Sequence, residues 1–87
     1  MEYNILGIKL VQTCGGCPEQ YDAFIGPVQV GYLRLRHGFF YVDYPHCGGD
    51  TIYTANPKGD GIFEYDEREH YLTKACKAIW DEHMREE

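Results

Sequence analysis

The chain has 87 residues and a formal net charge of −6 at neutral pH, with 15% aromatic and 25% charged residues. This length predicts one domain over residues 1–87 with a modest core, and the aromatic content excludes an intrinsically disordered chain. The acidic balance disfavours direct binding to duplex DNA, because carboxylates repel the phosphate backbone.

The N-terminal sequence has no basic segment followed by an apolar run of signal-peptide length. No segment of the sequence approaches the roughly 18 apolar residues that are needed to span a membrane. We therefore expect an intracellular protein of the cytoplasm. In a reducing cytoplasm, the four cysteines are expected to be thiols or metal ligands rather than a disulfide framework.

Several short segments have the composition of β-strands. Leu6, Ile8 and Leu10 share one face by alternation, which predicts an N-terminal strand over residues 3–12. Turn residues separate further β-rich segments, which lie at 20–25, 28–36, 39–45 and 51–55. The pattern predicts a small antiparallel sheet of about four to five strands.

The apolar residues change phase within residues 28–36. Val28 and Val30 are even-numbered, whereas Leu33 and Leu35 are odd-numbered, and Gly31 is where a β-bulge fits. With Leu33 and Leu35 toward the core, the outer face of the sheet carries aromatic and basic side chains, which are Tyr32, Arg34, Arg36, Phe39, Tyr41 and Tyr53. Such side chains stack on bases and bind phosphates. β-Propensity and solubility alone also place Tyr and Arg on a sheet face.

From Asp66 onward, apolar residues recur at spacings of three and four, which predicts one C-terminal helix. The predicted stripe consists of Leu72, Ala75, Cys76, Ile79, Trp80 and His83. Asp66 and Glu69 have the spacing of a capping box. The predicted fold class is therefore α+β, a small antiparallel sheet packed by one C-terminal α-helix.

The stretch NPKGDGIFEYDE, residues 56–67, approaches the spacing of an EF-hand calcium loop. The residues that hold matching places are Asn56, Asp60, Gly61, Glu64 and Glu67. Pro57 and Lys58 occupy the second and third places, and a strand-like segment precedes the stretch where an EF-hand has a helix. We therefore interpret it as a turn that leads into a capped helix.

Cys14 and Cys17 have the two-residue gap of a zinc knuckle, and His46 or Cys47 could complete a tetrahedral set. A redox dithiol or a disulfide is a second interpretation of this pair, and ordinary turn cysteines are a third. Cys76 lies on the helix stripe and is expected in the core. Zinc is the one cofactor that the sequence suggests.

Most of the negative charge lies near the C-terminus. Residues 60–87 have nine acidic and four basic side chains, whereas residues 1–59 have five and four. Six acidic residues are candidates for contact with a basic partner: Glu64, Asp66, Glu67, Glu69, Asp81 and Glu82. The sequence contains no GxSxG, P-loop or HExxH motif, so we expect a protein that is not an enzyme.

The segments VGYLRLRHG, at 30–38, and DERE, at 66–69, resemble those of small bacteriophage-encoded proteins. The similarity extends over most of the chain from Cys14 onward. It implies a viral source and a bacterial cytoplasm, and it carries over no activity or site residue. It favours an inhibitor of a bacterial defence system, similar to an anti-CRISPR, whose acidic residues occupy a basic nucleic-acid channel.

Two alternatives use other parts of the chain. The first is a module that sequesters a nucleotide signal on Tyr32, Arg34, Arg36 and Tyr41, with a homodimer to enclose the ligand. The second is a phage accessory protein with a zinc-stabilised turn at Cys14 and Cys17.

Overall fold

The computed structural model describes residues 1–14 and 17–85 of the chain. Within them, six strands form one antiparallel sheet in chain order, followed by one helix. The elements are β1 Glu2–Ile5, β2 Ile8–Gln12, β3 Glu19–Ile25, β4 Val28–Arg36, β5 Phe39–Tyr44, β6 Asp50–Ala55 and α1 Arg68–Arg85. The α+β class is thus confirmed, with more strands than the four to five expected.

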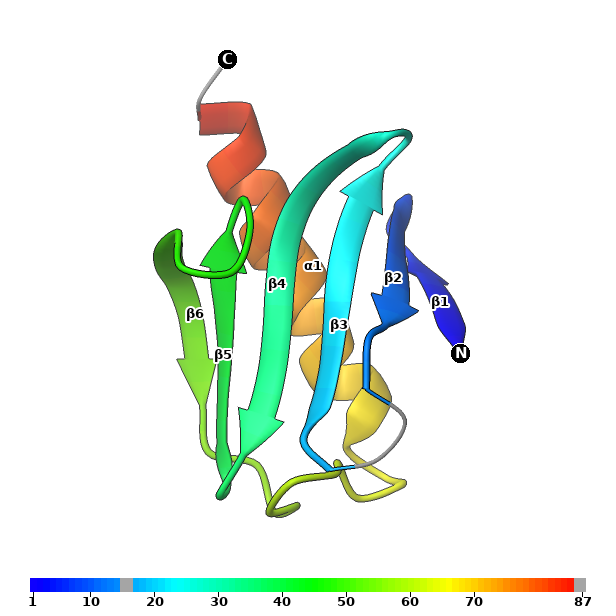
Figure 1. Cartoon of the computed structure of the whole chain (residues 1–87), viewed down its shortest axis with the longest axis vertical. Coiled ribbons are helices and arrows are strands. Elements are labelled where there is room, and N and C mark those ends of the chain that lie inside the picture. The colour runs from blue at the N-terminus through cyan, green and yellow to red at the C-terminus, as the bar shows by residue number, and fades with distance from the viewer. Residues whose placement is uncertain (15–16, 86–87) are drawn as a thin grey trace.

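The helix crosses one face of the sheet diagonally and leaves the other face uncovered (Figure 1). Its stripe is as predicted, since Leu72, Ala75, Cys76 and Ile79 are fully buried against the sheet. Burial raises the pKa of the Cys76 thiol to about 12, as expected for a core cysteine. No helix among the described residues is long and apolar enough to cross a membrane.

The predicted N-terminal strand is wrong, because residues 3–12 form a hairpin. Leu6 and Gly7 both have positive φ, at 55° and 81°, and the turn pairs Ile5 with Ile8. Leu6 is therefore at a turn and half exposed. The turn is tied to the helix by Trp80, whose Nε1 donates a hydrogen bond to the Leu6 carbonyl at 2.7 Å.

A β-bulge lies in β4 where the apolar phase changes. Ala23 pairs with Gly31 and Phe24 with Gln29, which leaves Val30 as the extra residue. A Cβ atom at Gly31 would lie 2.7 Å from Ile79 Cδ1, so the glycine lets the helix approach the sheet closely. Of the two valines grouped by the sequence, Val30 is buried and Val28 is exposed.

The register of β4 and β5 confirms the predicted outer face, with one exception. Leu33 pairs with Val42 on the covered face, and Arg34 pairs with Tyr41 on the open face. Tyr53 pairs with Val42 and packs against the core, so its predicted outward position is wrong. The reason is that paired residues of an antiparallel ladder share a face, and Val42 faces the core.

The segment between β6 and α1 closes the lower end of the sheet in Figure 1. Phe63, 3% exposed, is its anchor in the core. The Phe63 ring centroid lies 5.0 Å from that of Phe40 and 5.7 Å from that of Tyr71. This anchor fixes the residues on either side of it, which form the surface described next.

Candidate partner-binding surface

The stretch from Asn56 to Glu67 is a loop organised by one buried carboxylate. Glu67 accepts backbone N–H hydrogen bonds from Lys58 at 2.8 Å, Gly59 at 2.8 Å and Glu64 at 2.9 Å. Burial opposes ionisation, but these donors outweigh it and hold the pKa of Glu67 below its ordinary value. The glutamate at the twelfth place of the calcium-like pattern thus binds the loop's own backbone, in agreement with the interpretation as a turn.

Glu67 also caps the helix. Its contact with the Glu64 N–H spans three residues, which is the reach-back half of a capping box. The prediction gave this role to Asp66 and Glu69, two positions too late. Asp66 instead accepts a hydrogen bond from Lys58 Nζ at 3.0 Å, in an exposed ion pair.

A second buried carboxylate, Glu19 of β3, ties the sheet to the helix. The Arg68 Nε and Nη2 atoms donate to the two Glu19 oxygens at 2.8 and 3.1 Å. The Phe63 N–H donates at 2.9 Å, and the Tyr21 hydroxyl donates as well. Burial opposes ionisation of Glu19, but the bonds from Arg68, Tyr21 and Phe63 lower its pKa below the ordinary value.

Between these anchored residues, the chain exposes an aromatic ring among carboxylates. Tyr65 is 95% exposed and Ile62 is 48% exposed, and Glu64, Asp66 and Glu69 are exposed around them. These five residues are called the acidic surface below. Glu64 and Glu69 make none of the side-chain hydrogen bonds that hold this part of the described structure, so their charges are available to a partner.

The acidic surface borders a groove of about 570 Å³ between β1 and the start of α1. Its lining residues are Tyr3, Asn4, Ile5, Tyr65, Asp66, Arg68, Glu69 and Leu72. A smaller hollow of about 310 Å³ shares Tyr3 and Arg68 with the groove. The acidic surface is therefore one wall of a concave region.

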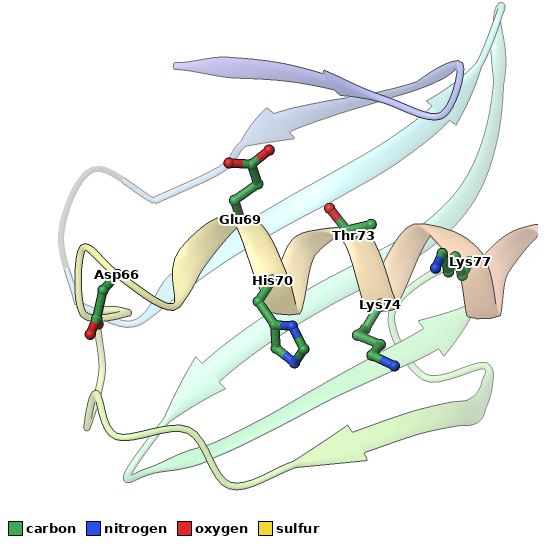
Figure 2. Close-up of a pocket in the computed structure, with 6 residues that line it drawn as sticks. All are labelled: Asp66, Glu69, His70, Thr73, Lys74 and Lys77. Carbon is green, nitrogen blue, oxygen red and sulfur yellow. The ribbon is translucent and has the colours of Figure 1, made fainter.

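The six acidic residues predicted to contact a partner are not brought together. Glu67 is 7% exposed, and its carboxylate is hydrogen-bonded to the loop backbone rather than presented at the surface. Asp81 and Glu82 lie roughly 18 Å farther along the helix than Glu69, and Glu82 pairs with Arg85 at 3.2 Å. Figure 2 shows Lys74 and Lys77 on the helix beyond Glu69. Of the six, Asp66 and Glu69 line one groove, and Glu64 belongs to the same exposed stretch of the chain as Asp66.

The predicted ligand residues do gather on the open face of the sheet. The Tyr41 ring centroid lies 6.2 Å from that of Tyr32 and 6.0 Å from that of Phe39. A hydrogen bond to Tyr41 raises the pKa of Arg34, whose Nε is buried without a partner. Arg36 is exposed. Tyr32 is 8% exposed, so its ring is not accessible for stacking as predicted.

The Tyr32 hydroxyl donates a hydrogen bond to the Gln20 side chain at 3.2 Å, and the connection between β5 and β6 folds across the open face (Figure 1). This connection is held by Asp43, which accepts hydrogen bonds from the Gly48 N–H at 3.2 Å and the Thr51 hydroxyl at 2.7 Å. Burial, with Tyr41 and Cys47 nearby, raises the pKa of Tyr32. The accessible part of the face is therefore Phe39, Tyr41 and Arg36.

The predicted metal residues are divided between the two ends of the sheet. Cys14 and Cys17 lie in the β2–β3 connection, and His46 and Cys47 lie in the β5–β6 connection at the opposite end. The glycines at 15 and 16 lie outside the described residues. Within residues 1–14 and 17–85, no group of three or more His, Cys, Asp or Glu side chains is arranged to hold a metal ion. Zinc binding at Cys14 and Cys17 stays a prediction.

Sequence reasoning missed Tyr65 and the groove residues Tyr3 and Arg68. Tyr65 carried one usable signal, since an aromatic residue between Glu64 and Asp66 has no periodicity that would bury it. Tyr3 and Arg68 carried none, because they are 65 positions apart and meet only through the fold. No protein-family model, curated protein or solved structure matches the chain.

Proposed function

We propose that this chain is a non-enzymatic binding protein that engages a basic protein through the acidic surface. The proposal rests on one observation. Tyr65 is 95% exposed, and it lies in the same surface as Glu64 and Glu69, whose carboxylates make none of the hydrogen bonds that hold the loop. Exposed aromatic residues are frequent anchors of protein interfaces. Acidic side chains around such an anchor steer a basic partner and fix its orientation.

The resemblance to bacteriophage proteins narrows the class of partner. A defence nuclease of the bacterial host needs a basic channel for its nucleic acid, and a compact acidic protein can occupy that channel. Inhibition then follows from exclusion of DNA or RNA and requires no chemistry from the chain. This is the anti-CRISPR-like role expected from the sequence, confined to Glu64, Asp66 and Glu69 with Tyr65.

The test is phage plating on bacteria that each carry one defence system and express the chain. The wild-type chain is expected to restore plating in at least one strain. Tyr65→Ala, and separately Glu64→Lys/Glu69→Lys, should reduce that rescue by at least about tenfold, because an interface anchor or its charges are lost.

The matched control is Asp81→Lys/Glu82→Lys, which changes the net charge by the same amount at the other end of the helix. It should retain the rescue. Equal loss with this control would show that total charge, and not the acidic surface, is responsible. Absence of rescue in every strain would reject the inhibitor role for those systems.

A second candidate is a nucleotide-binding module, which the accessible Phe39, Tyr41 and Arg36 favour. A flat ring and a guanidinium group together suit a base and its phosphate. Because the helix covers only the other face of the sheet, this candidate needs a homodimer that closes the open face. Nucleotides should then raise the melting temperature of the wild-type chain but not of Arg36→Gln or Phe39→Ala, with Lys9→Gln as control.

A further inference from the structure

β1 is an edge strand with a free side. The sheet order places it beside β2 alone, with Tyr3 opposite Leu10 and Asn4 opposite Lys9. The Gln12 N–H donates to the Met1 carbonyl at 3.0 Å. Because hydrogen-bonded and non-bonded pairs alternate in an antiparallel ladder, Tyr3 and Ile5 bond to β2.

The alternation leaves the backbone N–H and C=O groups of Glu2 and Asn4 directed away from the sheet. Such groups are a template for another strand. β1 contains neither the proline nor the lysine that commonly protects an edge.

The groove lies directly along this edge. Tyr3, Asn4 and Ile5 line one side of it, Tyr65, Asp66 and Glu69 line the other, and Leu72 belongs to the lining as well. In Figure 2, Glu69 points from the helix toward the ribbons of β1 and β2. A strand added to β1 would therefore have the acidic surface beside it.

Charge selects the kind of strand that fits. Asp66 and Glu69 line the groove, and Glu2 is exposed on β1. The cation of Arg68 is already held by Glu19, so the groove offers net negative charge. Since alternate side chains of a strand point to opposite sides, every second residue of an added strand faces the groove. Apolar side chains in this set can meet Tyr3 and Ile5, and basic side chains in the same set can meet Asp66 and Glu69.

We propose that the partner contributes an extended basic segment that adds to the sheet beside β1, hydrogen-bonds to Glu2 and Asn4, and lies in the groove. This deepens the proposed function, on which it rests, by naming the part of the partner that is recognised. Strand addition gives affinity through main-chain bonds and specificity through alternate side chains. Two copies of this chain paired through β1 would instead bring like charges together.

The probe is a library of random dodecamer peptides selected for binding to the wild-type chain. We expect selected sequences in which every second residue belongs to a set that combines basic and apolar side chains. Asn4→Pro should weaken binding of the selected peptides by at least about tenfold, because proline removes the outward N–H while an edge strand tolerates it. Asn4→Ala, which removes the side-chain amide but keeps that N–H, should bind clearly more tightly than Asn4→Pro.

Peptides with N-methyl groups on alternate residues test the pairing without altering the protein. A strand on an edge uses every second N–H group, so one methylated set should abolish binding and the other should leave it intact. Equal binding of both sets, equal binding to Asn4→Pro and wild type when both are folded, or failure to select any basic peptide would overturn strand addition.

The two proposals fail separately. If selected peptides lose affinity for Glu64→Lys/Glu69→Lys yet bind folded Asn4→Pro normally, the acidic surface stands and strand addition is wrong. If peptides are insensitive to both substitutions, both are wrong for this ligand. A dimer in size-exclusion chromatography that Asn4→Pro dissociates would assign the edge to a second copy of the chain and reject the basic segment.

Discussion

Two sets of carboxylates at the same end of the molecule differ in their roles: one set is buried and holds the fold together, and the other is exposed to a partner. Glu19 and Glu67 are buried, and each accepts three or more hydrogen bonds from groups inside the protein. Glu64 and Glu69 are exposed, although they lie only three and two residues from Glu67 in the sequence. The contrast teaches that neighbouring acids in one acidic stretch can be divided between holding the loop and meeting a partner.

The largest effect is expected for Glu19→Ala. The substitution leaves Arg68 without its carboxylate partner and removes the acceptor of the Phe63 N–H and Tyr21 hydroxyl. We expect the free energy of unfolding to fall by about 3 to 5 kcal/mol, as when one partner of a buried ion pair is removed. Urea denaturation measures this, with Glu2→Ala as an exposed control on the same sheet. A loss no larger than that of the control would contradict the internal role.

Glu67→Ala should have the next largest effect. Three backbone N–H groups lose their acceptor, but water can reach part of the loop, so we expect a loss of about 2 kcal/mol. Glu64→Ala in the same loop should leave the urea midpoint unchanged, because the Glu64 carboxylate serves no internal donor. If Glu64→Ala destabilised the chain as much as Glu67→Ala, the division between the two sets would fail.

Acid should weaken the fold through the same two residues. The pKa values of Glu19 and Glu67 are lowered from an ordinary value of 4.5, so the unfolded chain takes up protons at a higher pH than the folded one. The stability that these two carboxylates contribute is therefore fully present above the ordinary pKa of 4.5, and it is lost as the pH falls through their lower folded-state pKa values. Urea midpoints measured from pH 6 down to pH 3 should decline, and Glu67→Gln should reduce the decline.

Asp66→Asn should have the smallest effect on stability. In its ion pair with Lys58, the Asp66 side chain is 68% exposed and the Lys58 side chain is 65% exposed. Such exposed ion pairs contribute little to the free energy of unfolding. The melting temperature should match that of wild type, measured by circular dichroism, while binding of the basic partner weakens. A clear fall in melting temperature would place Asp66 with the internal carboxylates.

The sequence predicted the main elements because their periodicities were intact. The alternation of Leu33 and Leu35 with Arg34 and Arg36 gave the correct faces of β4, and the change of phase located the bulge near Gly31. The N-terminal hairpin was missed because leucine is rarely found at positive φ, so Leu6 gave no turn signal.

The site was harder to predict, since burial of an acid leaves no mark in the sequence. Glu64, Asp66 and Glu67 have the same local composition, and only the path of the loop around Phe63 turns Glu67 inward. The groove joins Tyr3 to Arg68 and Glu69, which no local pattern connects. The negative charge of this region could be predicted from the sequence. Which carboxylates are hydrogen-bonded inside the protein and which are exposed could not.

The most direct test of the central claim compares Glu64→Lys/Glu69→Lys with Glu67→Ala in two assays, urea denaturation and rescue of phage plating. We expect the double variant to unfold at the wild-type midpoint and to lose rescue, whereas Glu67→Ala should unfold at lower urea. A double variant that is destabilised like Glu67→Ala, or that rescues plating fully, would contradict this claim.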